Sequence, residues 1–213
     1  MTILITGGNR GIGAAMADRY RDEGREVLAT ARDGSADLVL DVSDPASVGA
    51  MAEQVEGPLD LLVCNAGVYL DKGHALGSGY GPRVWAESFA VNVTGVFLVI
   101  EALLPRLRQA AGAKIAIISS QMASQERAPG GSYVYRASKA AVLNLGRNLA
   151  TDLKSEGIAV GIYHPGWVQT DMGGAAAEIT VDQAAEGLMA RFSALSVATT
   201  GCFETWDGRP QAF

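Results

Sequence analysis

The sequence has few of the residues that build metal and redox sites. Its 213 residues include only two cysteines and two histidines. Cys64 and Cys202 each lie in an apolar, strand-like run, far from the other and without the close spacing of a metal or redox pair, so we expect two buried thiols. Apart from His74 and His164 there is no histidine, so no cluster of histidine, cysteine and carboxylate is available to hold a catalytic metal.

Long apolar runs and basic clusters are also missing. No segment approaches the roughly 18 uninterrupted apolar residues of a membrane span. Met1 leads directly into a strand-like run without a signal peptide, so we expect a cytoplasmic protein. The 17 basic residues are scattered among 23 acidic ones, and the net charge of -6 argues against a nucleic-acid surface. The length and the 48% hydrophobic content predict one domain over residues 1–213.

What is present is a regular alternation of strand-like and helical patterns. This alternation predicts an α/β fold of the Rossmann type, a doubly wound parallel sheet of about seven strands with helices on both faces. The segment between the second and third strands is too short for a helix. The predicted strands cover residues 2–6, 26–29, 37–40, 59–64, 114–118, 158–163 and 201–205.

Several helix boundaries have recognisable signals. Asp44 or Ser43 is expected to cap a helix that has Pro45 in its first turn. A long helical pattern runs from Val84 to about Leu104, and Pro105 is expected to kink or end it. The helix that carries Tyr135 and Lys139 follows the loop of residues 121–132 and should run to about Glu156, where Gly157 stops it, and a last helix is expected over residues 181–195.

A glycine turn follows the first predicted strand and opens the first helix. It reads Gly7-Gly8-Asn9-Arg10-Gly11-Ile12-Gly13, so its spacing is Gly-x-x-x-Gly-x-Gly instead of the commoner Gly-x-Gly-x-x-Gly. Glycines are needed where the backbone turns tightly and approaches a pyrophosphate at a helix N-terminus. In this strand-turn-helix context, the motif predicts a dinucleotide site.

The end of the second strand indicates which dinucleotide binds. A site that prefers NAD carries an acid there, whereas this chain has Thr30, Ala31 and Arg32. Together with Arg10, Arg32 would place two cations beside a 2′-phosphate, which favours NADP(H) over NAD(H). The alternative is that both arginines are ordinary solvated surface residues.

Tyr135 and Lys139 are one helical turn apart, so their side chains share a face of a predicted helix. A tyrosine has an ordinary pKa of about 10, and a nearby ammonium favours the phenolate and lowers this value. The pair would then be a usable acid and base. The alternative is an ordinary helix surface.

Small and polar residues follow several strands at the edge where open α/β sheets bind ligands. Asn65-Ala66-Gly67 follows the fourth strand, Ser119-Ser120 the fifth, and Pro165-Gly166 comes just after the sixth. Asn92 lies amid apolar neighbours in a helical segment, where it is either a packing residue or a functional one.

Taken in order, these motifs resemble the short-chain dehydrogenase/reductase family over nearly the whole chain. The local sequences of residues 133–139 and 164–172 most resemble the C-factor-like carbonyl reductases. The motifs that carry the resemblance are Thr6-Gly7 with Gly11-x-Gly13, Asn65-Ala66-Gly67, Asn92, Ser120, Tyr135-x-x-x-Lys139 and Pro165-Gly166.

The resemblance implies a role for each catalytic candidate. Tyr135 would donate a proton to a carbonyl oxygen while the nicotinamide supplies hydride. Lys139 would bind the nicotinamide ribose and lower the pKa of Tyr135. Asn92 would hold a water that relays protons, and Ser120 would hydrogen-bond the substrate oxygen. Because the spacing from Ser120 to Tyr135 is slightly longer than is common in the family, Ser119 and Ser124 are weaker candidates for that role.

The resemblance also implies cofactor contacts, an open site and an oligomer. The loop after Thr170 is short, which leaves little material for a substrate lid. Pairing of the helix of residues 84–104 and the Tyr135 helix across a two-fold axis would give a homodimer or homotetramer. The implied cofactor-binding residues are Gly7, Asn9, Arg10, Gly11, Ile12, Gly13, Arg32, Asp41, Val42, Asn65, Ala66, Gly67, Tyr135, Lys139, Pro165, Gly166, Val168 and Thr170.

The predicted function is therefore an NADP(H)-dependent oxidoreductase that reduces a small aldehyde or ketone to an alcohol, or catalyses the reverse reaction. The alternative is a non-catalytic NADP(H)-binding redox sensor or signalling protein. Such proteins commonly lose the catalytic tyrosine or lysine, and this chain keeps both Tyr135 and Lys139.

Overall fold

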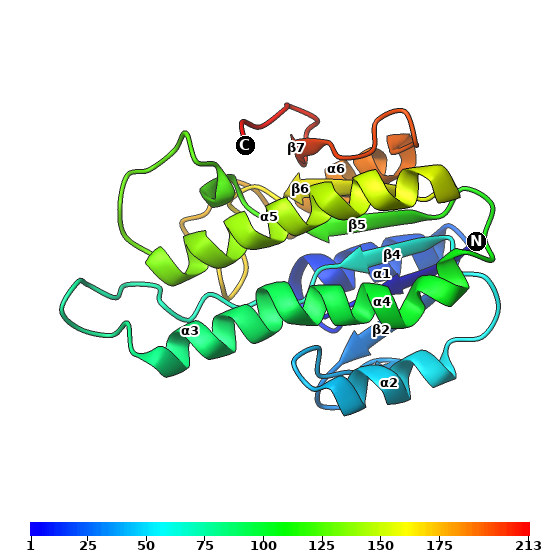
Figure 1. The fold of residues 1–213 in the computed structure, drawn as a ribbon, viewed down its shortest axis with the longest axis horizontal. Coiled ribbons are helices and arrows are strands. Elements are labelled where there is room, and N and C mark those ends of the chain that lie inside the picture. Colours follow the sequence, from blue (N-terminus) through cyan, green and yellow to red (C-terminus); the bar gives the residue numbers. More distant parts are fainter.

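A parallel sheet of seven strands forms the centre of the computed structural model, which describes residues 1–213 (Figure 1). The strand order is β3-β2-β1-β4-β5-β6-β7. This arrangement confirms the predicted fold class. The strands are β1 (Thr2–Ile5), β2 (Glu26–Ala31), β3 (Leu38–Val39), β4 (Leu61–Cys64), β5 (Lys114–Ile118), β6 (Ala159–His164) and β7 (Phe203–Thr205).

Helices cover both faces of the sheet. In Figure 1, α2 (Pro45–Gln54), α4 (Gly95–Leu107) and α5 (Tyr133–Leu153) lie in front of it, and α1 (Gly11–Asp22) and α6 (Val181–Ala194) lie behind it. Successive strand residues face opposite sides. Leu4 accordingly belongs to the core beneath α2, α4 and α5, whereas its neighbours Ile3 and Ile5 belong to the core beneath α1 and α6.

Most of the predicted boundaries are confirmed. Asp44 caps α2, since its carboxylate accepts a hydrogen bond from the Ala46 amide at 3.0 Å, with Pro45 in the first turn. Between β2 and β3 the chain forms only a turn, as expected. After α5, a 3-10 turn over Lys154–Glu156 ends at Gly157, whose φ is 75°.

The long helix is one continuous rod, Pro82–Leu107, in three parts. The first part, α3 (Pro82–Phe89), leads into a π-helical turn, Ala90–Thr94, and then into α4. Pro105 does not end the helix. It lies in the last turn of α4, where a missing amide removes only one hydrogen bond.

By length and composition the rod is apolar enough to cross a membrane, but its buried face packs in the sheet core, as in the core helix of a soluble fold.

The two cysteines differ in burial. Cys64 is buried in β4, and burial raises the pKa of its thiol to about 12. Cys202, by contrast, is only partly buried, because it precedes β7 at the edge of the sheet, and its sulfur lies 3.8 Å from the Tyr163 hydroxyl. The expectation of a buried thiol is therefore correct for Cys64 and wrong for Cys202.

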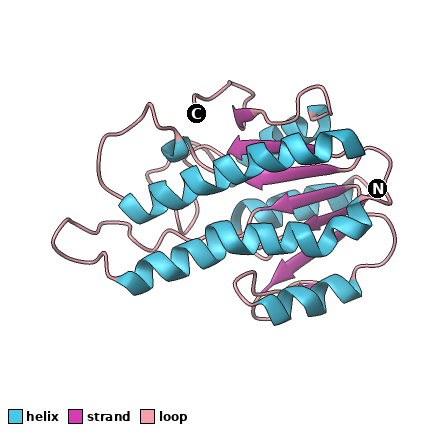
Figure 2. Cartoon of the chain, viewed as in Figure 1, coloured by secondary structure: helices cyan, strands magenta, loops and turns pink.

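The long loops gather at one end of the sheet. In Figure 2 the strand arrows point to the left, toward the pink loops of residues 65–81, 119–132 and 165–180. These loops follow β4, β5 and β6. The carboxyl edge of the sheet, where open α/β sheets bind ligands, therefore carries most of the irregular chain.

Candidate active site

The glycine turn joins β1 to α1, and its geometry requires glycine. A Cβ atom on Gly13 would lie 2.3 Å from the carbonyl oxygen of Gly7, which no side chain tolerates. Gly7 and Gly11 have φ values of 64° and 54°, in the region that glycine adopts most easily. No side chain caps the N-terminus of α1. Free backbone amides at a helix N-terminus suit a pyrophosphate.

Asn65 holds the glycine turn in place. Its side-chain nitrogen donates to the carbonyl oxygens of Thr6 at 2.9 Å and Gly7 at 3.0 Å. The Thr6 hydroxyl in turn accepts hydrogen bonds from the amides of Asn65 and Ala66, both at 3.0 Å. The Asn65-Ala66-Gly67 motif therefore connects β4 to the turn that precedes α1.

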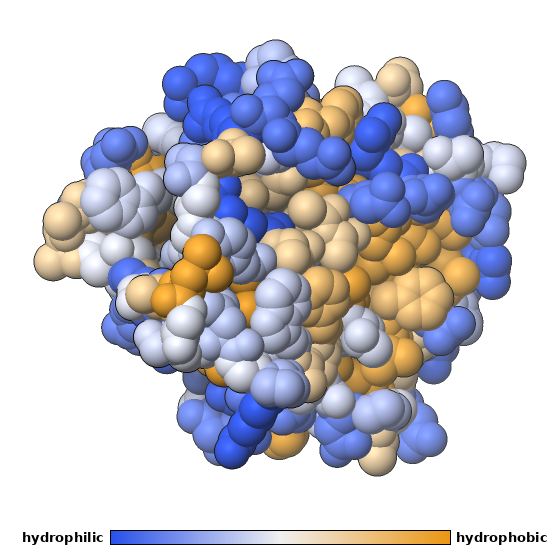
Figure 3. Space-filling view, turned by 60° about the vertical axis from the view of Figure 1, so that its left-hand side comes forward, coloured by the Kyte–Doolittle hydropathy of each residue, from blue (hydrophilic) through white to orange (hydrophobic).

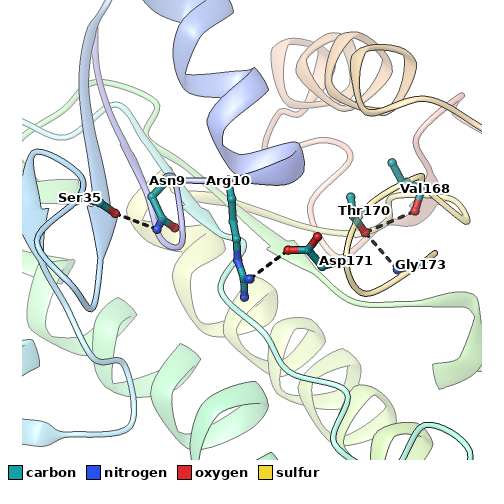
Figure 4. Close-up of polar contacts among 7 residues, drawn as sticks. All are labelled: Asn9, Arg10, Ser35, Val168, Thr170, Asp171 and Gly173. Atoms are coloured by element: carbon teal, nitrogen blue, oxygen red, sulfur yellow. Dashed lines mark hydrogen bonds and ion pairs between the residues drawn. The ribbon is translucent and has the colours of Figure 1, made fainter. Parts of the chain in front are cut away.

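Arg10 and Asn9 extend from the glycine turn in different directions (Figure 4). The Arg10 guanidinium pairs with Asp171 at 3.2 Å, and both side chains are largely exposed. Asn9 donates to the hydroxyl of Ser35 at 2.9 Å, in the turn between β2 and β3. Arg32 is exposed at the end of β2 and forms no ion pair. In this structure Arg10 reaches the loop after β6 instead of sharing a partner with Arg32.

The remaining predicted cofactor residues lie along the same edge. The Asp41 carboxylate accepts hydrogen bonds from the amide and hydroxyl of Ser43 at 2.9 and 2.6 Å, which lower its pKa. Val42 is buried against α4, and its carbonyl lies so close to Gly95 that a side chain there would collide with it. Further along the edge, Ile12, Pro165, Gly166, Val168 and Thr170 all line one cavity.

Tyr135 and Lys139 lie on α5 and are both buried, with 8% and 5% of their surface exposed. The Lys139 ammonium is 5.7 Å from the centre of the Tyr135 ring and donates to the carbonyl of Ile118 at 3.0 Å. The Ser120 hydroxyl acts on the Tyr135 phenol by lowering its pKa, and it accepts a hydrogen bond from the Met122 amide at 3.1 Å. The structure therefore brings Ser120, Tyr135 and Lys139 together.

The two alternative serines face elsewhere. The Ser119 hydroxyl donates to the backbone carbonyl of Lys139 at 3.0 Å, so it fixes α5 against β5. Ser124 is buried, and its hydroxyl has no hydrogen-bond partner. Among the three serines considered, Ser120 is the one that interacts with the Tyr135 side chain.

Asn92 lies in the π-helical turn and is almost completely buried. Its side-chain oxygen accepts from the Val68 amide at 2.8 Å, and its nitrogen donates to the Val68 carbonyl at 2.9 Å and to the Ser138 hydroxyl at 3.0 Å. A Cβ atom on Gly67 would lie 3.3 Å from the Asn92 oxygen and 3.4 Å from the Lys139 nitrogen. Asn92 is thus a satisfied buried amide that also borders the lysine, and π-helical turns occur often at functional sites.

The pKa values of Tyr135 and Lys139 differ from their ordinary values. Burial raises the pKa of Tyr135 above its ordinary value, and the neighbouring Tyr69 and Asp71 add to this shift, while the Ser120 hydroxyl opposes it. Burial lowers the pKa of Lys139 to about 8. The expectation that Lys139 lowers the pKa of Tyr135 is therefore wrong for this structure, because burial dominates and raises that pKa. Tyr135 is a neutral phenol, and thus a proton donor, at neutral pH.

Tyr135 is contacted by two residues that the sequence analysis did not single out. The ring of Tyr69 stacks on that of Tyr135, with centroids 4.1 Å apart and an interplanar angle of 21°. The carboxylate of Asp71, which has no exposed surface, accepts hydrogen bonds from the amides of Val134 at 2.9 Å and Tyr135 at 3.2 Å. Both residues come from the loop after β4, far away along the chain, and no local pattern marks them.

A cavity of about 580 Å³ lies beside Ser120, which is the one catalytic candidate in its lining. Ser120 and Tyr69 line it on the side of Tyr135, and Trp167, Trp206 and Ile179 supply apolar walls. No group of three or more histidine, cysteine or acidic side chains is placed to hold a metal ion. The site thus offers a buried phenol, a serine hydroxyl and an ammonium beside a space large enough for a small molecule.

The family model described as short chain dehydrogenase matches residues 1–179. The chain belongs to the short-chain dehydrogenase family. This confirms the resemblance seen in the order of the sequence motifs, and it makes the protein an oxidoreductase of that family.

Individual relatives agree with this assignment. C-signal of Myxococcus xanthus is 37% identical over 71% of this chain and 91% of its own length. A dehydrogenase of 1-hydroxy-2-glutathionyl-2-methyl-3-butene from Rhodococcus sp. strain AD45 is 33% identical over 97% of both chains. Among solved structures, the NADPH-bound carbonyl reductase from chicken fatty liver is 30% identical, with a TM-score of 0.91 over 100% of this chain and 98% of that one. The match to this short-chain dehydrogenase fold therefore extends through the whole sheet.

Proposed function

We propose that this short-chain dehydrogenase is an NADP(H)-dependent carbonyl reductase that converts an aldehyde or ketone to an alcohol, or catalyses the reverse reaction. The observation that carries the proposal is the grouping of the buried Tyr135 phenol with the Lys139 ammonium, 5.7 Å from the centre of its ring, and with Ser120, which lowers the pKa of the phenol and lines the cavity. A carbonyl oxygen placed against both hydroxyls would be polarised by Ser120 and protonated by Tyr135.

Each side chain has one task in this mechanism. Bound NADPH supplies the hydride for the carbonyl carbon. Tyr135 gives its proton to the oxygen, and its raised pKa keeps that proton available at neutral pH. Ser120 orients the oxygen, while Lys139 binds the nicotinamide ribose. Asn92, held by its three hydrogen bonds, fixes the π-helical turn beside Lys139 and supports the proton relay.

Several residues support NADP(H) as the cofactor. The end of β2 carries Arg32 without an ion-pair partner, and Thr30 and Ala31 before it are buried and bear no acid. Arg10 would have to leave Asp171 to reach a 2′-phosphate. An exposed ion pair is typically worth less than about 1 kcal/mol, so this costs little. The chicken carbonyl reductase, which has the same fold, was solved with NADPH.

We also propose that the enzyme is a cytoplasmic homodimer or homotetramer assembled through α4 and α5. Apolar side chains are exposed on the long helix, among them Phe97 and Trp85, each with 38% of its surface accessible. In Figure 3, hydrophobic side chains gather to the right of centre. The rotation from Figure 1 has moved the front face, which carries α4 and α5, to this side. A second copy would cover this area. Both cysteines are free thiols, which suits a reducing compartment.

The proposed function is tested by mixing the purified protein with NADPH and a panel of aldehydes and ketones and following the loss of NADPH absorbance. We expect turnover of at least one class of carbonyl, and none without the carbonyl. An absence of turnover across a broad panel, with NADPH still bound, would favour the non-catalytic sensor instead.

A further inference from the structure

The cavity beside Ser120 is positively charged in an acidic protein. Its lining includes three cationic side chains, Lys72, Arg127 and Arg209, and one carboxylate, Glu178; counting also Asp207, which pairs with Arg209, the net charge is +1. The whole chain carries -6. A local field opposite in sign to that of the protein concentrates anions at this opening.

Arg127 has no acidic partner. Its guanidinium donates to the side-chain oxygen of Gln121 at 2.7 Å, and Gln121 also lines the cavity. Its backbone carbonyl accepts a hydrogen bond from Arg136 at 3.2 Å, which ties this loop to α5. Because a neutral amide orients Arg127, its positive charge is not neutralised and is available to a ligand.

Arg209 is held at the cavity by a tight turn after β7. The Thr205 amide donates to the Arg209 carbonyl at 2.9 Å, and the Arg209 amide donates to the Thr205 hydroxyl, also at 2.9 Å. Its Nε atom pairs with Asp207 at 2.9 Å. That contact orients the guanidinium and leaves its two terminal amino groups without a partner in the structure.

His164 lines the same cavity, close enough to Arg127 and Arg209 for their charges to act on it. It ends β6 beside β5, where the Ser119 amide donates to the Tyr163 carbonyl at 2.8 Å. His164 is 8% exposed, lines the cavity, and has no hydrogen-bond partner for its buried Nδ1 atom. Burial and the charges of Arg127 and Arg209 lower its pKa to about 4, so at neutral pH the ring is an uncharged donor and acceptor.

We propose that this cavity selects carbonyl substrates that carry a carboxylate, with Arg127 and Arg209 binding the carboxylate and His164 donating a further hydrogen bond. This inference rests on the proposed reductase function. The two guanidiniums provide the fork-shaped donors that match a carboxylate, and the buried imidazole gains the partner it lacks. The apolar walls formed by Trp167 and Trp206 accommodate the carbon skeleton between the two polar ends.

The test compares each acid with its own methyl ester. With NADPH as the reductant, we would measure kcat/KM for 4-carboxybenzaldehyde and succinic semialdehyde and for their methyl esters. Charge-assisted hydrogen bonds predict that the acids are preferred about ten- to a hundredfold. Arg127→Gln and Arg209→Gln should each reduce this preference while turnover of the esters stays near the wild-type rate. Arg25→Gln, which removes an exposed charge before β2, is the matched control and should leave the preference unchanged.

Binding provides a second readout that needs no turnover. Trp167 and Trp206 line the cavity, so benzoate should change the intrinsic fluorescence and benzamide should bind more weakly. Arg127→Gln should remove this difference. Esters used as well as acids, or a preference that survives in both arginine variants, would overturn the anion site and leave the reductase intact. Benzoate binding that depends on Arg127, in a protein that reduces no carbonyl, would uphold the anion site and reject the reductase.

Discussion

Asp71 caps the helix that carries Tyr135. Its carboxylate accepts hydrogen bonds from the backbone amides of Val134 at 2.9 Å and Tyr135 at 3.2 Å, and it is completely buried. A carboxylate at a helix N-terminus satisfies amides that have no partner within the helix and interacts favourably with the helix dipole. The same negative charge also raises the pKa of the Tyr135 phenol. Asp71 thus positions the proposed proton donor and adjusts its acidity.

Asp71→Asn separates these two effects, because the amide oxygen still accepts hydrogen bonds but the charge is gone. The pKa of Tyr135 should fall toward its ordinary value. Alcohol oxidation needs the phenolate, so its rate should begin to rise at a lower pH than in the wild type. The measurement is the pH profile of kcat/KM for alcohol oxidation. Asp71→Ala, which also loses the cap, should be less stable than Asp71→Asn. An oxidation profile identical to that of the wild type would show that Asp71 has only a structural role.

Lys139 should lower the stability of the protein at neutral pH. Its pKa is about 8 in the folded state and 10.5 ordinarily, so below pH 8 the folded state contains a buried charge. Each pKa unit corresponds to about 1.4 kcal/mol, so this burial costs on the order of 3 kcal/mol below pH 8. The cost disappears as the pH rises from 8 to 10.5, because the folded state releases its proton first.

Lys139→Met tests this linkage. At pH 7 the variant should have a higher free energy of unfolding in urea than the wild type, and the difference should shrink as the pH approaches 10.5. The variant should also bind NADPH poorly and turn over slowly. A lower stability than the wild type at pH 7, or a difference that does not change with pH, would contradict the role of burial.

Arg32 should determine the choice of cofactor. Arg32→Ala removes the unpaired cation at the end of β2, and the wild-type preference for NADPH over NADH, expected at about ten- to a thousandfold in kcat/KM, should fall at least tenfold. Arg10→Ala should have a smaller effect, because Arg10 already pairs with Asp171. Raising the salt concentration should weaken the wild-type preference. Equal use of both cofactors by the wild type would mean that both arginines are ordinary surface residues.

Phe97 tests the proposed assembly. It is 38% exposed on α4, and Phe97→Glu would place a charge in the proposed interface without disturbing the core. Light scattering should show a dimer or tetramer for the wild type and the 22.2 kDa monomer for the variant. Arg83→Glu, on the exposed start of the same helix, is a control for added charge. A monomeric wild type at the concentration of the assay would contradict the proposed dimer or tetramer.

Local patterns in the sequence were enough to predict the parallel sheet of about seven strands, the glycine turn, and the grouping of Tyr135 with Lys139. Each depends on periodicity or on glycine placement within a short segment. The contacts of Tyr69 and Asp71 with Tyr135 could not be predicted, because the loop after β4 and the start of α5 meet only in the fold. The direction of the Tyr135 pKa shift was missed for a related reason: burial dominates it, and burial is a property of the packed structure.

The central claim is that Tyr135 protonates a carbonyl while hydride arrives from the cofactor. The most direct measurement uses NADPH with deuterium at both hydrogens of nicotinamide C4, the carbon that carries the hydride, with 4-carboxybenzaldehyde as substrate and mass spectrometry of the alcohol. The wild type should place one deuterium on the carbinol carbon, and Tyr135→Phe should bind NADPH normally yet form this alcohol about 10² to 10⁴ times more slowly. An alcohol without deuterium, or a Tyr135→Phe variant that works at the wild-type rate, would contradict the mechanism.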